Sequence, residues 1–182
     1  MSAFPVIWLA RHGETAWSLS GQHTGRTDIA LTARGEESAR RLGERLRGLA
    51  IARVFTSPLR RAARTCALAG FADQAEVDPD LVEWDYGDYE GRTSAEIRAE
   101  RPEWMLWRAG RAIDRVRRAG GDVLVFSSGH FLRVLASRWL ALEPSAGRFF
   151  LLDTASLSAL GYDRSFAQPV IRLWNDVAHG VE

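Results

Sequence analysis

The feature that most constrains the fold is an alternation of short apolar runs with longer amphipathic stretches. The clearest run is Asp122–Ser127 (DVLVFS), and a helical pattern follows it at Phe131–Leu140. A short, almost continuous apolar run is typical of a strand buried on both faces, as in a parallel sheet. Strands that alternate with helices predict an α/β fold with a mainly parallel central sheet.

The same alternation extends over the whole chain. We expect further strands at Phe4–Ala10, Ala52–Thr56, Glu76–Asp78, Ser158–Tyr162 and Val170–Trp174. We expect helices at Leu31–Arg47 with Thr32 as N-cap, from Ser57-Pro58 to Leu68, at Ser94–Glu100 and at Glu103–Arg118, and an ordered loop at Leu81–Gly91. No internal repeat or linker interrupts the pattern, so residues 1–182 are expected to form a single domain.

Composition excludes several classes of protein. The hydrophobic fraction is 46%, the charged fraction is 26% and the formal net charge is +1, which gives no sign of a nucleic-acid partner. A single cysteine, Cys66, permits no intramolecular disulfide and fits a reducing compartment. The first apolar run is too short for a signal peptide or a membrane span, so we expect a cytoplasmic protein with no membrane partner.

Polar residues that could act in catalysis or bind a ligand follow three of the expected strands. Arg11-His12 follows the first strand, Ser57 the second, and Ser128-Gly129-His130 the strand that ends at Ser127. In open α/β sheets, ligands bind outside the carboxyl ends of the strands. The three segments are therefore expected to converge on one edge of the sheet.

The segment Arg11-His12-Gly13-Glu14-Thr15 suits nucleophilic chemistry. A neutral imidazole can attack phosphorus with one nitrogen while its other nitrogen donates to a backbone carbonyl. Gly13 permits a close approach of the backbone, and Arg11 offers a planar fork of donors to phosphate oxygens. These neighbours favour a functional histidine over an ordinary core or surface histidine.

Two other segments offer an anion site and a proton donor. The helix that starts near Ser57 presents free N–H groups and several arginines, although Arg60 and Arg64 individually are expected to be solvated. The segment at residues 83–91 (EWDYGDYEG) places Glu83 among aromatic residues that would desolvate it and raise its pKa, whereas nearby arginines would lower it. Asp88 and Glu90 are expected to be ordinary loop acids.

These motifs together resemble the histidine phosphatase superfamily, also called the phosphoglycerate mutase-like family, over nearly the whole chain. The resemblance is closest to its phosphatase branch, and the matching motifs are RHGET (11–15), HTGRTDIALTARG (23–35), SPLRRAART (57–65), EWDYGDYEG (83–91) and SSGHFLRVL (127–135). The resemblance implies a three-layer α/β/α sandwich that needs no metal or other cofactor. It implies a small phosphorylated substrate, and it leaves open whether the chain forms a homodimer.

The resemblance also implies roles for individual residues. His12 would become phosphohistidine, Arg11 and Arg61 would bind the phosphate, and Glu83 would donate the proton. Arg61 is preferred to Arg60 because it holds the fifth position of the SPLxR pattern. Further residues match positions that line the substrate pocket, namely Ser18, Thr24, Gly25, Ser128 and His130.

Two departures from the family pattern affect the expected activity. Ser128 stands where the family normally has a histidine, and serine donates a hydrogen bond but carries no positive charge. His130 lies two residues on and is not expected to replace it as a catalyst. The segment after Gly110 lacks the Gly-rich, Glu-containing insertion of relatives, which would leave the rim of the pocket more open.

The residues therefore predict a metal-independent phosphatase acting on small phosphate monoesters, with sugar phosphates as the preferred class. A phosphoglycerate mutase is the alternative within the enzymes, although mutases usually have a longer insertion that closes the pocket. The alternative outside the enzymes is a catalytically weakened protein that binds phosphorylated ligands, and the feature that motivates it is Ser128.

Overall fold

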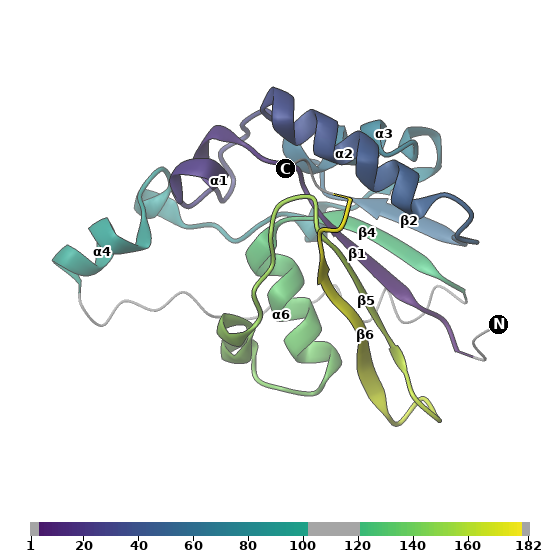
Figure 1. The fold of residues 1–182 in the computed structure, drawn as a ribbon. Helices are drawn as coiled ribbons and strands as arrows, with labels where there is room; N and C mark the ends of the chain where they lie inside the picture. Colours follow the sequence, from purple (N-terminus) through teal and green to yellow (C-terminus); the bar gives the residue numbers. More distant parts are fainter. Residues whose placement is uncertain (1–3, 102–120, 180–182) are drawn as a thin grey trace.

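The computed structural model describes residues 4–101 and 121–179, and its centre is a six-stranded sheet with strand order β3-β2-β4-β1-β5-β6 (Figure 1). The pairs β3–β2, β2–β4 and β4–β1 are parallel, whereas β1–β5 and β5–β6 are antiparallel. The prediction of a mainly parallel sheet is therefore confirmed. The strands are β1 (Ile7–Arg11), β2 (Arg53–Thr56), β3 (Ala75–Val77), β4 (Val123–Ser127), β5 (Leu157–Tyr162) and β6 (Pro169–Asp176).

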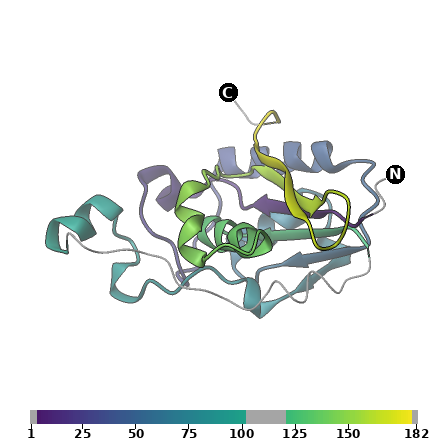
Figure 2. The ribbon, with the colours of Figure 1, turned by 90° about the horizontal axis from the view of Figure 1, so that it is seen from below.

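Helices cover both faces of this sheet, which confirms the three-layer α/β/α prediction. Two long helices, α2 (Ala33–Leu46) and α3 (Arg60–Leu68), lie on one face, and α6 (Gly129–Trp139) lies on the other (Figures 1 and 2). The shorter α1 (Ala16–Ser20) and α4 (Ser94–Glu100) stand beyond the carboxyl end of β1 (Figure 1). Short 3₁₀ helices occupy Ala72–Gln74, Pro79–Leu81, Gly87–Tyr89 and Pro144–Phe149.

Alternating side chains of the buried strands form two separate cores. In β4, Val123 and Val125 pack towards α6, in a cluster that includes Trp139. Leu124 and Phe126 point to the opposite face and join the cluster beneath α2 and α3. All four β4 side chains have no exposed surface, as expected for a strand covered on both faces. This central position fixes the carboxyl ends of β1 and β4 beside each other.

The helix α2 forms as the sequence predicts. Thr32 is its N-cap, and the Thr32 side chain accepts a hydrogen bond from the backbone N–H of Gly35. Ala39, Leu42 and Leu46 are buried at the helical spacing and pack on the sheet. Burial of each leucine contributes about 1.5–3 kcal/mol before conformational entropy is subtracted.

The start of α3 differs from the prediction. The helix begins at Arg60 rather than at Ser57-Pro58, because Leu59 has an extended backbone conformation. The backbone N–H of Arg60 donates to the carboxylate of Asp28 at 2.7 Å, so a distant loop supplies an acceptor at the helix terminus. Local capping rules could not reveal this acceptor.

Other differences are small or fall outside the described residues. The helix α1 was not expected, although Thr15 and Ser18 form a reciprocal capping box at its start. The remaining strand and helix predictions agree within a few residues, and the expected helix at Glu103–Arg118 and the departure after Gly110 lie outside the described ranges. Within residues 4–101 and 121–179, no helix has the length and apolar character needed to cross a bilayer.

Candidate active site

A pocket of about 270 Å³ lies at the carboxyl ends of β1 and β4. Six of the predicted site residues line it, namely Arg11, His12, Ser18, Thr24, Glu83 and His130. The pocket therefore joins residues from β1, from α1 and the loop after it, from the loop that follows β3, and from α6. The pocket lies at the edge of the sheet that the strand pattern predicts, but Ser57, which was expected to converge there, does not line it.

His12 is held at the end of β1 by backbone and side-chain contacts. Its backbone N–H donates to the carbonyl of Ser127 at 3.0 Å, and its Nδ1 lies 2.7 Å from the carbonyl of Gly13. Because a carbonyl can only accept, Nδ1 bears the proton and Nε2 keeps its lone pair. Burial lowers the pKa of His12 well below its usual range, and the charges of Arg11 and Arg61 lower it further. The ring is therefore neutral, and the lone pair of Nε2 is chemically suited to nucleophilic attack.

Gly13 lets this turn pack against two helices. Its backbone N–H donates to the buried hydroxyl of Thr65 at 2.9 Å, and that hydroxyl donates to the carbonyl of Arg61 at 2.7 Å. A Cβ atom at Gly13 would clash with the backbone of Gly35 in α2. The absence of a side chain therefore allows the close approach that positions His12.

Arg11 lies in the pocket wall beside His12. Its guanidinium donates to the carbonyl of Leu152 and packs on Gly129, where a Cβ atom would lie 3.1 Å from Nε. The Nε atom is buried and makes no hydrogen bond within the described part of the chain. Burial lowers the pKa of Arg11, and the nearby Glu83 raises it. An arginine so placed keeps its charge and retains N–H donors for an anion.

Arg61 lies behind the pocket and does not line it. Its guanidinium is fully buried and donates to the carbonyls of Thr24 at 3.0 Å, Gly25 at 2.7 Å and Thr27 at 3.0 Å. Its Nε lies 3.4 Å from the hydroxyl of Ser128. Arg61 therefore anchors the loop at residues 24–27 while its charge acts on His12.

Ser128 and Gly25 accompany Arg61 behind the pocket wall. Ser128 is the N-cap residue of α6, but its hydroxyl makes no capping hydrogen bond and is buried. Gly25 packs so tightly that a Cβ atom there would clash with Glu90 and with the carbonyl of Trp84. Of the nine predicted site residues, three (Arg61, Gly25 and Ser128) thus stand one layer behind the surface of the pocket.

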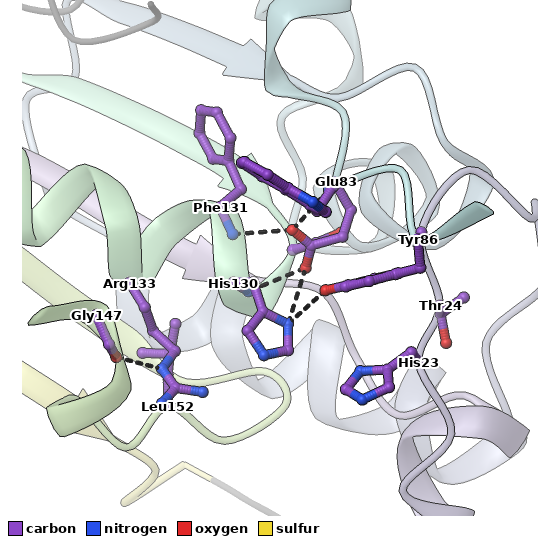
Figure 3. Close-up of polar contacts among 12 residues, drawn as sticks. His23, Thr24, Glu83, Tyr86, His130, Phe131, Arg133, Gly147 and Leu152 are labelled. Carbon is purple, nitrogen blue, oxygen red and sulfur yellow. Dashed lines mark hydrogen bonds and ion pairs between the residues drawn. The ribbon is translucent and has the colours of Figure 1, made fainter. Parts of the chain in front are cut away.

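Glu83 faces the pocket from the loop that follows β3. Its Oε1 accepts from the backbone N–H groups of Trp84 at 3.0 Å and Phe131 at 2.9 Å, and its Oε2 accepts from that of His130 at 2.9 Å (Figure 3). Burial raises the pKa of Glu83, while these hydrogen bonds and the charge of Arg61 oppose the shift. The net direction, which the sequence left open, is upward, so the group is suited to donate a proton.

The prediction that Glu90 is an ordinary loop acid is wrong, because its carboxylate binds the backbone of another loop. Its carboxylate accepts from the backbone N–H groups of Arg26 at 2.6 Å and Thr27 at 2.7 Å, and from the Thr27 hydroxyl. Glu90 and Arg61 thus both bind the backbone of the loop at residues 24–27. Arg64 pairs with Glu36 at the surface, at 2.8 Å, in agreement with the expectation of a solvated side chain.

The described residues contain no cluster of side chains suited to bind a metal ion. In the ranges 4–101 and 121–179, no group of three or more His, Cys, Asp or Glu side chains is arranged to hold an ion. The pocket instead presents cationic, imidazole and hydroxyl groups.

Comparison with known proteins identifies the family. The protein-family model described as histidine phosphatase superfamily (branch 1) matches residues 7–115 and 107–177 of the sequence. The chain belongs to this superfamily. It is 38% identical to an acid phosphatase of Mycobacterium tuberculosis over 89% of each chain. It is 36% identical to the sedoheptulose 1,7-bisphosphatase of Saccharomyces cerevisiae over 78% of this chain and 69% of the relative.

Other members of the superfamily have different names. The chain is 30% identical to a protein named probable phosphoglycerate mutase GpmB from Erwinia tasmaniensis, over 95% of this chain and 94% of the relative. Among solved structures, an open reading frame product of Mycobacterium tuberculosis superimposes with a TM-score of 0.84 at 35% identity, covering 94% of this chain and 97% of the other. The family and the fold are thus established together.

Several pocket residues of this superfamily member were not predicted individually. They include Trp17, Gln22, His23, Tyr86, Ser94, Arg133 and Leu152. His23, Tyr86 and Arg133 do fall inside the motifs that carry the resemblance, which was the one available signal. The side chains of these residues meet because the segment after α1 and the loop after Glu83 pack against α6. Local sequence patterns do not encode this packing.

Proposed function

We propose that the chain is a phosphatase that hydrolyses small phosphate monoesters, with sugar phosphates as the preferred class, through a phosphohistidine at His12. The observation that carries this proposal is the state of that ring. Its Nδ1 is bound to the carbonyl of Gly13, its pKa is lowered so that it stays neutral, and it lines a pocket that also contains Arg11 and Glu83. A nucleophile, a cation and a carboxyl group with a raised pKa are thus available in one cavity.

In the first step, the Nε2 lone pair of His12 attacks phosphorus and the bond between phosphorus and the ester oxygen breaks. The electron pair of that bond moves to the leaving oxygen, which takes the proton from Glu83 and departs as an alcohol. Arg11 binds the phosphoryl oxygens directly, and Arg61 adds positive charge from behind the pocket. Fixed charges of this kind stabilise the transition state without reorganisation.

In the second step, water attacks the phosphohistidine. The Glu83 carboxylate accepts a proton from that water, the bond between phosphorus and nitrogen breaks, and its electron pair returns to Nε2. Inorganic phosphate leaves, and Glu83 and His12 regain their initial states. The cycle uses no group outside the chain, so we expect activity without added metal and in the presence of EDTA.

The preference for sugar phosphates rests on further polar residues that line the pocket. They supply hydroxyl, amide and imidazole groups and are Ser18, Gln22, His23, Thr24 and Ser94. Such groups exchange hydrogen bonds with the hydroxyls of a polyol. The relatives named acid phosphatase and sedoheptulose 1,7-bisphosphatase also support hydrolysis of phosphate esters over mutase activity.

The test is a panel of phosphate esters with purified wild-type protein and the His12→Ala variant. We expect phosphate release by the wild type, loss of release in the variant, and an acid-labile phosphoryl label on His12 after a brief reaction with ³²P-labelled ester. Interconversion of 2- and 3-phosphoglycerate without release would instead make the chain a mutase. Binding of esters with turnover no higher than that of His12→Ala would make it a binding protein.

Ser128→His adds a second measurement to this panel. A histidine there would place a further cationic donor next to Arg61, in the position that relatives normally fill. We expect a higher kcat on the preferred ester and a smaller change in KM. An unchanged kcat would mean that the site has adapted to serine.

A further inference from the structure

A single peptide unit connects Arg11 to the strand β6. The carbonyl of Leu152 accepts a hydrogen bond from the Arg11 guanidinium. The N–H of the same peptide unit belongs to Asp153 and donates to Oδ1 of Asn175 at 2.7 Å. A trans peptide is planar, and its N–H and C=O groups point in opposite directions. An acceptor that fixes the N–H therefore also fixes the direction of the carbonyl that holds Arg11.

Arg11 depends on this carbonyl for its orientation. Within residues 4–101 and 121–179, the Leu152 carbonyl is the one acceptor of a hydrogen bond from the Arg11 guanidinium, and Nε has no partner there. A guanidinium is a planar fork, so one fixed N–H direction limits where its other donors can point. Leu152 is buried and lines the pocket together with Arg11. The direction of its carbonyl therefore controls which donors of Arg11 face a bound anion.

A bulge in β6 presents Asn175 to this peptide. Trp174 and Asn175 of β6 stand opposite the single residue Ser158 of β5, which is the arrangement of a β-bulge. The φ angle of Asn175 is +56°, in the left-handed region that asparagine adopts more readily than most other residues with a side chain. Its backbone N–H donates to the Ser158 hydroxyl at 3.0 Å. The backbone from which the amide reaches the 152–153 peptide is thus itself fixed.

The Asn175 amide binds Asp153 at two points. Besides accepting the backbone N–H, it donates from Nδ2 to Oδ2 of Asp153 at 2.8 Å. Two hydrogen bonds from one planar amide restrict its rotation. Burial lowers the pKa of Arg11, whereas Glu83 and then Asp153 raise it, so the charge of Asp153 acts on the same arginine. Asn175 itself does not line the pocket, so any effect on a ligand there is indirect.

Other backbone contacts hold the rest of this loop without Asn175. The backbone N–H of Ala155 donates to the carbonyl of His12 at 3.0 Å, and the carbonyl of Ser156 accepts from the backbone N–H of Arg11 at 3.2 Å. Loss of the Asn175 side chain should therefore release one peptide unit rather than unfold the loop.

We propose that Asn175 is a positioning residue for phosphate binding. Its side-chain oxygen sets the plane of the 152–153 peptide, and the carbonyl of that peptide directs the donors of Arg11 into the pocket. The inference rests on the proposed phosphatase function and deepens it, because Arg11 is the arginine that would bind the phosphoryl oxygens.

The test measures binding of inorganic phosphate to the wild type and to Asn175→Gly by isothermal titration calorimetry. Glycine adopts a positive φ without strain, so the variant removes the amide and keeps the backbone conformation. We expect the Kd for phosphate to rise about tenfold, as for one charge-assisted hydrogen bond that loses its geometry. The matched control is Trp174→Phe, which removes a hydrogen bond from the neighbouring residue of β6 to the carbonyl of Leu151. Its Kd should stay within about twofold of the wild-type value.

An exchange of the two side chains separates this contact from general loosening of β6. In Asn175→Asp/Asp153→Asn, the carboxylate at position 175 would accept both the backbone N–H and the side-chain amide of residue 153, and the net charge is unchanged. Asn175→Asp alone brings two carboxylates together and should bind phosphate more weakly than the wild type. The exchange should restore the affinity. An exchange variant as weak as Asn175→Gly, or an equal loss of affinity in Trp174→Phe, would overturn the inference.

Phosphate binding needs no turnover, so the two proposals can fail separately. A wild type that hydrolyses no ester, together with weakened phosphate binding in Asn175→Gly, would refute the phosphatase function and retain the role of Asn175. An unchanged Kd in Asn175→Gly, or no measurable binding of phosphate to the wild type, would refute that role whatever the result with phosphate esters.

Discussion

Replacing Thr65 by valine tests how His12 is held in place. Thr65 is fully buried in α3, and its hydroxyl accepts the backbone N–H of Gly13 at 2.9 Å. Valine has nearly the same shape but no acceptor, so the substitution leaves a buried N–H group without its partner. An orphaned backbone donor costs about 1–3 kcal/mol. For a domain of this size, each kcal/mol corresponds to roughly 2–4 °C, so Tm should fall by roughly 2–12 °C.

The same substitution should also lower activity. The carbonyl of Gly13 fixes Nδ1 of His12, and a loosened turn would let the imidazole leave its productive orientation. The decrease should appear mainly in kcat, since Thr65 does not line the pocket.

Urea denaturation of wild type, Thr65→Val and Thr65→Ser measures the predicted cost. Serine keeps the hydroxyl, so Thr65→Ser should lie closer to the wild type in both unfolding free energy and kcat. The reasoning is refuted if Thr65→Val unfolds within about 0.5 kcal/mol of the wild type, a change typical of neutral surface substitutions.

Three further predictions concern neighbouring parts of the site. Gly35→Ala should reduce the free energy of unfolding by about 1–3 kcal/mol in urea titrations, because its Cβ atom would overlap the backbone of Glu14. Arg61→Lys should cost at least about 1.5 kcal/mol by the same assay, since lysine cannot reproduce the bonds to the 24–27 loop. For an alkyl ester, wild-type kcat should fall as pH rises through the raised pKa of Glu83, and Glu83→Gln should lower kcat about 10²–10⁴-fold and remove that basic limb from the pH profile.

The layered fold was predictable because its signals are local. The apolar run at Val123–Ser127 and the Thr32 cap with its buried stripe in α2 each specify an element without reference to the rest of the chain. Placing His12 at a strand end needed one further rule, that ligands gather at the carboxyl ends of parallel strands. The family motifs then indicated Glu83 as its partner across the pocket.

The contacts of the site were not predictable, because they join segments far apart in sequence. The Asp28 carboxylate at the start of α3 and the Glu90 carboxylate under the 24–27 loop are both acidic residues in unremarkable sequence surroundings. The hydrogen bond between Tyr86 and His130 spans 44 residues. No periodicity or capping rule relates such positions, so only the packed structure reveals them.

Most of the N–H donors of Arg61 are already used within the protein. A guanidinium has five N–H donors, and four hydrogen bonds already lead from Arg61 to Thr24, Gly25, Thr27 and Ser128. At most one donor remains for a phosphate, so Arg61 acts chiefly through its charge and its hold on the loop. Arg11, whose buried Nε has no hydrogen bond in the described residues, is the arginine with donors available. Since serine at position 128 adds no charge, we expect direct phosphate binding in this superfamily member to depend on Arg11 more than the sequence motifs imply.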